Sequence, residues 1–227
     1  MTLKVIVFDF DGTLADTYDA FIEIANSLSE EFGYKPVKEQ EQEQLKNLSA
    51  KDLIKQSEIS VFKIPFVLKR LKSELTHKIQ ELKPIKDIPY CVKQLKSQGY
   101  SLGIITSNAE ENVVSFLKNH QLEQFFEFIY AGTTLFGKHK IIKKLLKEKQ
   151  LLPHEVMYIG DETRDIHSAK KSRVQCVGVT WGFNSSQALA KQEPDFLINN
   201  PYELITILDN CQYDMMDEQS KVTSLTI

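Results

Sequence analysis

The sequence predicts an α/β fold in which a doubly wound parallel sheet carries an inserted helical region. Short apolar runs, mostly rich in β-branched or aromatic residues, recur along the chain, and each is typical of a buried strand. From residue 87 onward these runs alternate with segments of helical periodicity, which favours right-handed crossovers and a parallel sheet. Residues 16–84 carry helical patterns and no convincing strand. We therefore expect a Rossmann-like core with an inserted helical cap domain.

The expected strands are the apolar runs themselves. They lie at Val5 to Phe8, Leu102 to Thr106, Phe126 to Tyr130, Val156 to Ile159 and Val174 to Val179. Helices are expected between the later strands, because apolar residues recur there on one helical face, as at Val113, Phe116 and Leu117.

The inserted region begins directly after the first strand. Its first helix is predicted from apolar residues on one face, and Gly33 and Pro36 end it. Ser49 is suited to cap a later helix, and Pro65 kinks or restarts the segment of residues 61–82. An insertion at this point lies above the carboxyl end of the sheet, where open α/β sheets bind ligands. The expected parts are a core of residues 1–15 and 84–210, a cap of residues 16–83, and a loosely held polar tail of residues 211–227.

Composition and charge exclude several classes of protein. The 227 residues carry a formal net charge of -3, which offers no broad positive field for nucleic acid. No apolar run approaches the roughly 20 residues of a membrane helix, and acids follow the first run at once, so it is predicted to be a strand and not a signal peptide. Cys91, Cys176 and Cys211 are far apart and odd in number, which indicates reduced, buried thiols. We expect a cytoplasmic protein without nucleic-acid or membrane partners, and the sequence carries no signal for its oligomeric state.

Two carboxylates follow the first strand. Asp9 and Asp11 stand where the chain leaves the sheet, and Gly12 then permits a tight turn. Like charges this close require a positive partner if both are to stay ionised. Mg²⁺ suits them, because it prefers hard oxygen ligands, takes few from the protein and shares the rest with phosphate. The alternative is a loop of solvated or capping acids, so the interpretation depends on the other strand ends.

Two further signals are groups suited to an anion. Ser107 and Asn108 follow the second strand and begin a helix, whose free amides and dipole favour a phosphate, although both residue types are also ordinary helix caps. Lys138 opens a later helix, where a cation is unfavourable without an anionic partner. A solvated surface lysine is the alternative there, and Lys140 competes for the same role.

The fourth signal is a second pair of acids after a strand. Asp161 follows Gly160, and Asp165 comes four residues later at the start of a helix. Acids at a helix start can be caps, but the repeated strand-to-acid ending predicts that both acidic loops point into one crevice. Glu162 and Arg164 are expected to face outward or to brace the loop. We expect the four signals to converge on one site. The two carboxylate loops would hold a metal, one hydroxyl and one ammonium would hold phosphate oxygens, and a second carboxylate of the first loop would transfer the proton.

This combination resembles the haloacid dehalogenase-like hydrolase superfamily, in particular its phosphoglycolate phosphatase-like branch, which has a helical cap after the first strand. The resemblance runs from about residue 4 to residue 207. Its first, second and fourth motifs are similar to Asp9-Phe10-Asp11-Gly12-Thr13, Thr106-Ser107-Asn108, and Gly160-Asp161 with Asp165. Lys138 stands where the third motif belongs, although His139 follows it where many relatives have proline.

The resemblance implies a Mg²⁺-dependent phosphatase that hydrolyses small-metabolite phosphomonoesters through an aspartyl-phosphate intermediate. Asp9 would be the nucleophile, and Asp11 would protonate the leaving oxygen and then help water to open the intermediate. The phosphate ligands would be Ser107, Asn108 and Lys138, and the metal ligands would be Asp9, the backbone carbonyl of Asp11, Asp161 and Asp165. The loop of residues 180–183 would lie near the active site, the alternative being that Trp181 only packs.

Other activities of the same superfamily stay open. A dehalogenase is disfavoured, because relatives with that activity lack an acid at the place of Asp11. A phosphonate hydrolase would need a cap lysine to form a Schiff base, and the candidates include Lys35, Lys38, Lys46, Lys51 and Lys55. A sugar-phosphate mutase would share every core residue, and a non-catalytic module would keep the fold without turnover. The complete motif set favours the phosphatase, while the cap shows no substrate signature.

Overall fold

The computed structural model describes residues 3–133 and 137–209. In these ranges six strands form one sheet in the order β3-β2-β1-β4-β5-β6, and each strand is parallel to its neighbours. The strands are β1 (Val5–Phe8), β2 (Ser101–Ile105), β3 (Phe126–Tyr130), β4 (Val156–Gly160), β5 (Gln175–Val179) and β6 (Phe196–Ile198). The five predicted strands are confirmed to within about a residue, and β6 is an addition. The predicted doubly wound α/β core is therefore present.

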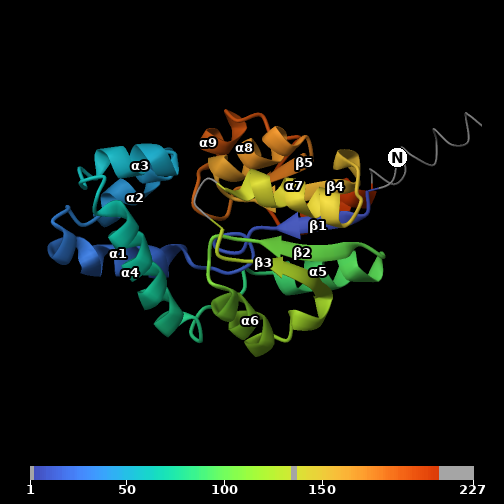
Figure 1. The fold of residues 1–227 in the computed structure, drawn as a ribbon, viewed down its shortest axis with the longest axis horizontal. Coiled ribbons are helices and arrows are strands. Elements are labelled where there is room, and N and C mark those ends of the chain that lie inside the picture. Colours follow the sequence, from blue (N-terminus) through green and yellow to red (C-terminus); the bar gives the residue numbers. More distant parts are fainter. Residues whose placement is uncertain (1–2, 134–136, 210–227) are drawn as a thin grey trace, which may run out of the picture.

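The sheet is covered by helices on both faces (Figure 1). The core helices are α5 (Ile88–Ser97), α6 (Glu110–Asn119), α7 (Lys138–Glu148), α8 (Thr163–Ser172) and α9 (Ser186–Ala190), with single 3-10 turns at Glu123–Phe125 and Pro153–Glu155. Residues 202–209 are also helical. Successive side chains of a strand point to opposite faces, so Ile6 and Phe8 of β1 join one apolar cluster while Val5 and Val7 join the other.

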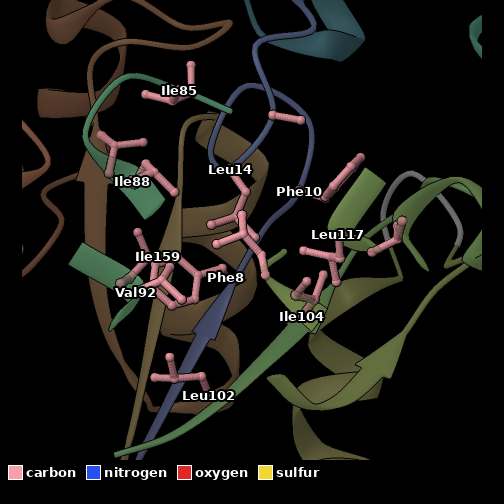
Figure 2. Close-up of a cluster of buried hydrophobic side chains, with 14 of the residues drawn as sticks. Phe8, Phe10, Leu14, Ile85, Ile88, Val92, Leu102, Ile104, Leu117 and Ile159 are labelled. Atoms are coloured by element: carbon pink, nitrogen blue, oxygen red, sulfur yellow. The ribbon is translucent and has the colours of Figure 1, made fainter. Parts of the chain in front are cut away.

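The two clusters fill the spaces between the sheet and its helices. Figure 2 shows part of the first, in which Phe8, Ile104 and Ile159 of the sheet meet Val92 and Leu117 of α5 and α6. The second contains buried residues of α7 and α8. Strands covered on both sides need apolar residues at nearly every position, which explains why the strand signal in the sequence was a continuous apolar run.

The inserted region contributes α1 (Tyr18–Phe32), α2 (Glu39–Leu45), α3 (Ala50–Gln56) and α4 (Ile64–Lys78). Three predicted helix ends are confirmed: Gly33, with φ 75°, caps the end of α1, the Ser49 hydroxyl caps α3 by accepting from the Asp52 amide, and Pro65 lies in the first turn of α4. Helices α1 and α4 pack together, whereas α2 and α3, both fully described, bury no residue.

The inserted helices lie beyond the carboxyl ends of the strands (Figure 1). All four fall within residues 16–83, and the exact division between core and cap stays a prediction. Cys91 and Cys176 are free and buried as predicted, while Cys211 and the predicted tail of residues 211–227 lie outside the described residues. Among the helices that the structure describes, none is long and apolar enough to cross a membrane.

Candidate active site

The topology brings the predicted residues to one edge of the sheet. The chain runs from β1 to β2 and β3 on one side and then returns to β4 on the other, so the order reverses beside β1. Ligands of open α/β sheets bind at the carboxyl ends of the strands at such a point. Asp9, Thr106 and Asp161 directly follow β1, β2 and β4, and Lys138 begins α7.

An ammonium joins the two acidic loops. Lys138 Nζ lies 2.5 Å from Asp9 Oδ2 and 2.6 Å from Asp165 Oδ1, and the three side chains are at most 3% exposed. Burial alone would lower the pKa of Lys138, but the carboxylates of Asp165 and Asp9 outweigh it and raise that pKa. Lys140 is exposed. The structure therefore places Lys138, and not its competitor, beside the acids.

Asp9 presents one carboxylate oxygen to this ammonium. Its other oxygen, Oδ1, accepts a hydrogen bond of 2.7 Å from the Phe10 amide, which orients the group. Burial raises the pKa of Asp9 to about 7, although Lys138 pulls it down. The loss of water around this carboxylate therefore outweighs its ion pair with Lys138.

Asp11 lies beside the start of α6. The Asn108 amide donates to both of its carboxylate oxygens, at 3.0 and 3.1 Å, and Asn108 Oδ1 accepts from Asn112 and from the Ala109 amide. Burial raises the pKa of Asp11 to about 6, against the effect of the Asn108 hydrogen bond. Asn108 therefore supports Asp11 here, and its predicted contact with phosphate stays a prediction.

Asp161 is fully buried and held from two loops. Its Oδ1 accepts from the Thr13 hydroxyl at 2.7 Å, and its Oδ2 accepts from the Phe183 amide at 2.7 Å. A Cβ at Gly12 or Gly182 would lie 2.3 or 2.2 Å from Asp161 Oδ2, so a larger residue at either position would displace the carboxylate.

The loop after β5 lies beside this carboxylate. Phe183 donates to Asp161, and Trp181 Nε1 donates to the Thr13 carbonyl at 3.2 Å. The expectation that residues 180–183 lie near the predicted site is confirmed, and Trp181 also packs against the core cluster. The contacts of Thr13 and Trp181 were not predicted from the sequence.

Glu162 is a candidate metal ligand that sequence reasoning missed. Oxygens of Asp9, Glu162 and Asp165 lie within 4.8 Å of one another, the spacing of groups that share a cation. The expectation that Glu162 and Arg164 face outward is wrong, because their side chains are 16% and 14% exposed; the other expectation, that they brace the loop, is confirmed by their ion pair. The signal was the position of Glu162 next to Asp161 at the strand end.

The acidic groups fit a hard divalent cation. Burial raises the pKa of Asp9 and Asp11 and, well above its ordinary value, that of Asp161, because removal from water disfavours the charged form of a carboxyl group. A bound cation would favour the charged form. The donors are carboxylate oxygens, which Mg²⁺ prefers. Asp9, Asp165 and Glu162 surround one point, whereas the carboxylates of Asp11 and Asp161 are each held by hydrogen bonds beside it.

Polar side chains link the inserted region to this edge of the core, and Lys72 and Asn184 are two of them. Lys72 of α4 donates to the Ser107 carbonyl oxygen at 2.5 Å. Asn184, in the loop after β5, donates to the carbonyls of Lys46 and Leu48 at 3.0 and 2.9 Å and accepts from the Thr163 amide at the start of α8. The cap therefore contacts the loops that carry the acids. Neither link was predicted, because each joins segments far apart in the sequence.

Known proteins resemble this chain over most of its length. The pattern of the haloacid dehalogenase-like hydrolases matches residues 6–179. A phosphoglycolate phosphatase from Synechococcus elongatus is 34% identical over 203 residues, covering 89% of this chain and 96% of that protein. A haloacid dehalogenase-like hydrolase from Streptococcus pneumoniae superposes with a TM-score of 0.75 at 25% identity, over 90% of this chain and 98% of that one. A predicted phosphatase from Clostridium acetobutylicum superposes with a TM-score of 0.78 at 21% identity, over 92% of this chain and 100% of that one. It therefore has the same fold.

Proposed function

Since this chain belongs to the haloacid dehalogenase-like hydrolases and is a phosphatase, we propose that it uses Mg²⁺ to hydrolyse small phosphorylated metabolites through an aspartyl-phosphate on Asp9. The observation that carries the proposal is the buried ammonium of Lys138 between Asp9 and Asp165. Phosphoglycolate is the first candidate substrate, because the relative from Synechococcus elongatus is named for it. We also place the enzyme in the cytoplasm, which the free thiols of Cys91 and Cys176 support.

Asp9 supplies the nucleophile. The Phe10 amide holds Oδ1, which leaves Oδ2 on the side of Lys138 to attack phosphorus. The new bond joins Asp9 Oδ2 to phosphorus while the bond from phosphorus to the ester oxygen breaks. A carboxylate nucleophile divides the displacement into two easier steps.

Asp11 supplies and recovers the proton. Its pKa, raised to about 6, keeps part of the population protonated near neutral pH, so that the carboxyl can donate to the leaving alcohol oxygen. The resulting carboxylate then accepts a proton from water as the water oxygen attacks phosphorus. The bond from phosphorus to Asp9 breaks, inorganic phosphate leaves, and Asp9 is a free carboxylate again.

The remaining groups hold the phosphoryl oxygens and the metal. Lys138 and the amides at the start of α6, with Ser107 and Asn108, neutralise and orient the anion. When bound, Mg²⁺ would supply positive charge that stabilises the negative charge of the transferring phosphoryl group. The residues proposed to hold it are Asp9, the carbonyl of Asp11, Asp161 and Asp165, with Glu162 as an added candidate.

Phosphate release from a panel of small phosphomonoesters tests the proposal. The purified protein is assayed with Mg²⁺ and with chelator, and Asp9→Asn serves as the contamination control because it removes the nucleophile at nearly constant size. We expect release that depends on Mg²⁺ and is absent from Asp9→Asn. Release by the variant at the wild-type rate contradicts the role of Asp9, and isomerised sugar phosphate without free phosphate would identify a mutase.

A further inference from the structure

Lys72 is the feature that the mechanism above leaves unused. It lies on the cap helix α4, next to the buried Leu71, and its ammonium reaches across to the core to donate to the Ser107 carbonyl at 2.5 Å. Ser107 follows β2 at the carboxyl edge of the sheet. The cap thus places one positive charge directly over the predicted phosphate-binding loop.

Three other cap lysines have partners within the cap. Lys46 contacts Glu43 and the ring of Tyr18, Lys63 donates to the Phe32 carbonyl, and Lys78 pairs with Glu23. Lys72 differs because its ammonium contacts the core, where it is also close enough to Asp11 for that carboxylate to act on its pKa.

The surroundings of Lys72 favour an anion. Partial burial lowers its pKa, while Asp11 raises it and Arg164 lowers it. An ammonium has three donors, and a neutral carbonyl balances none of its charge. A partly buried cation of this kind is stabilised by an anion that completes its hydrogen bonds.

Lys72 lies on the side of the site where the alcohol of a substrate belongs. In the proposed mechanism Asp11 protonates the ester oxygen, so the alcohol leaves beside Asp11. Lys138, by contrast, belongs to the core and contacts Asp9 and Asp165. The two lysines therefore approach the site from different parts of the protein, Lys138 from the core beside the nucleophile and Lys72 from the cap helix α4.

We propose that Lys72 is a specificity-determining residue that binds a second anionic group on the alcohol, such as a carboxylate close to the ester oxygen. This inference rests on the proposed phosphatase function. It makes phosphomonoesters that carry a second anionic group better substrates than those of similar size that do not, through a contact that the cap supplies.

Matched substrates and variants test it. Phosphoglycolate and ethyl phosphate are similar in length and differ in the carboxylate. We expect Lys72→Met to lower kcat/KM for phosphoglycolate about ten- to a hundredfold, the usual range for a hydrogen bond between charged groups, and to change ethyl phosphate less than about threefold. Lys72→Arg should keep part of the preference. Lys69→Met, at an exposed position of the same helix, should change neither substrate.

A binding measurement separates this inference from the phosphatase proposal. Calorimetry with Asp9→Asn, alone and combined with Lys72→Met, reports the affinity for both compounds without turnover. If the wild type is active but Lys72→Met lowers both substrates equally or neither, the inference falls while the phosphatase stands. If the wild type is inactive, the inference stands when Asp9→Asn prefers phosphoglycolate and Lys72→Met removes the preference; without that preference it falls as well.

Discussion

The two walls of the site are built from different kinds of contact. On the core wall, the side chains of Asp9, Asp165 and Lys138 are at most 3% exposed and are joined by ion pairs. On the cap wall, α2 and α3, which the structure describes completely, bury no residue. Between cap and core, Lys72 donates one hydrogen bond to a carbonyl and Asn184 donates two.

This difference separates chemistry from selection. Removing one member of a buried ion pair leaves a charge unpaired, at a cost of about 3–5 kcal/mol, so the core wall keeps its geometry. A hydrogen bond to a neutral carbonyl contributes about 1 kcal/mol, so the polar contacts of the cap wall are weaker than the ion pairs of the core wall. We infer that the core wall performs phosphoryl transfer and that the cap wall decides which alcohol is admitted.

The largest expected effect is on the core wall. Lys138→Ala should lower kcat about a hundred- to a thousandfold, the range for loss of one preorganised charge-stabilising group, and should destabilise the protein by about 3–5 kcal/mol because Asp9 and Asp165 lose their shared partner. Lys140→Ala, at an exposed position of the same helix, is the matched control and should stay within about twofold. Steady-state kinetics and thermal denaturation measure both. The reverse order would assign the phosphate lysine to Lys140.

An intermediate effect is expected on stability as a function of pH. Burial raises the pKa of Asp9 to about 7 and of Asp11 to about 6, both above the ordinary 3.8. Between these values the folded protein binds more protons than the unfolded chain, so the free energy of unfolding falls as pH rises. Without metal, the Tm should therefore drop as the pH rises from about 4 to about 7. Asp9→Asn removes one of the titrating groups, so its Tm should drop less, by the equivalent of about 1–3 kcal/mol.

Thermal denaturation in chelator measures this effect, with and without added Mg²⁺. Mg²⁺ should raise the Tm of the wild type most at the alkaline end, where Asp9 and Asp11 are ionised. Parallel curves for wild type and Asp9→Asn would show that the buried charge is compensated, and the contrast between the two walls would lose its electrostatic basis.

The smallest effect is expected on the cap wall. Asn184→Ala removes the hydrogen bonds to the Lys46 and Leu48 carbonyls, so KM should rise a few-fold, roughly three to ten times, with kcat changed less. Its Oδ1 also accepts from the Thr163 amide, so Asn184→Asp, which keeps that acceptor, is the informative companion variant. A loss in kcat as large as that of Lys138→Ala would mean that Asn184 supports the acidic loop itself, and the division between the walls would not hold.

Much of the fold could be predicted from local sequence patterns. Continuous apolar runs located β1 to β5, because a strand covered on both faces must be apolar throughout, and Gly33, Ser49 and Pro65 marked helix ends by their own backbone and capping chemistry. Strand β6 was missed because its three residues, Phe196–Ile198, are too few to show a pattern.

The convergence of the acidic residues could also be predicted from the sequence, whereas their contact partners could not. Parallel strands share one carboxyl edge, so residues after β1 and β4 had to meet, and Lys138 was singled out as a cation at an unfavourable helix start. The choice of Lys138 over Lys140, the place of Glu162 in the acidic cluster, and the reach of Lys72 to Ser107 depend on which way side chains point after packing. The local sequence specifies which helices and strands form and at which ends of them the reactive residues lie. Contacts between distant segments arise only when these elements pack, since burial and charge pairing are properties of the assembled fold.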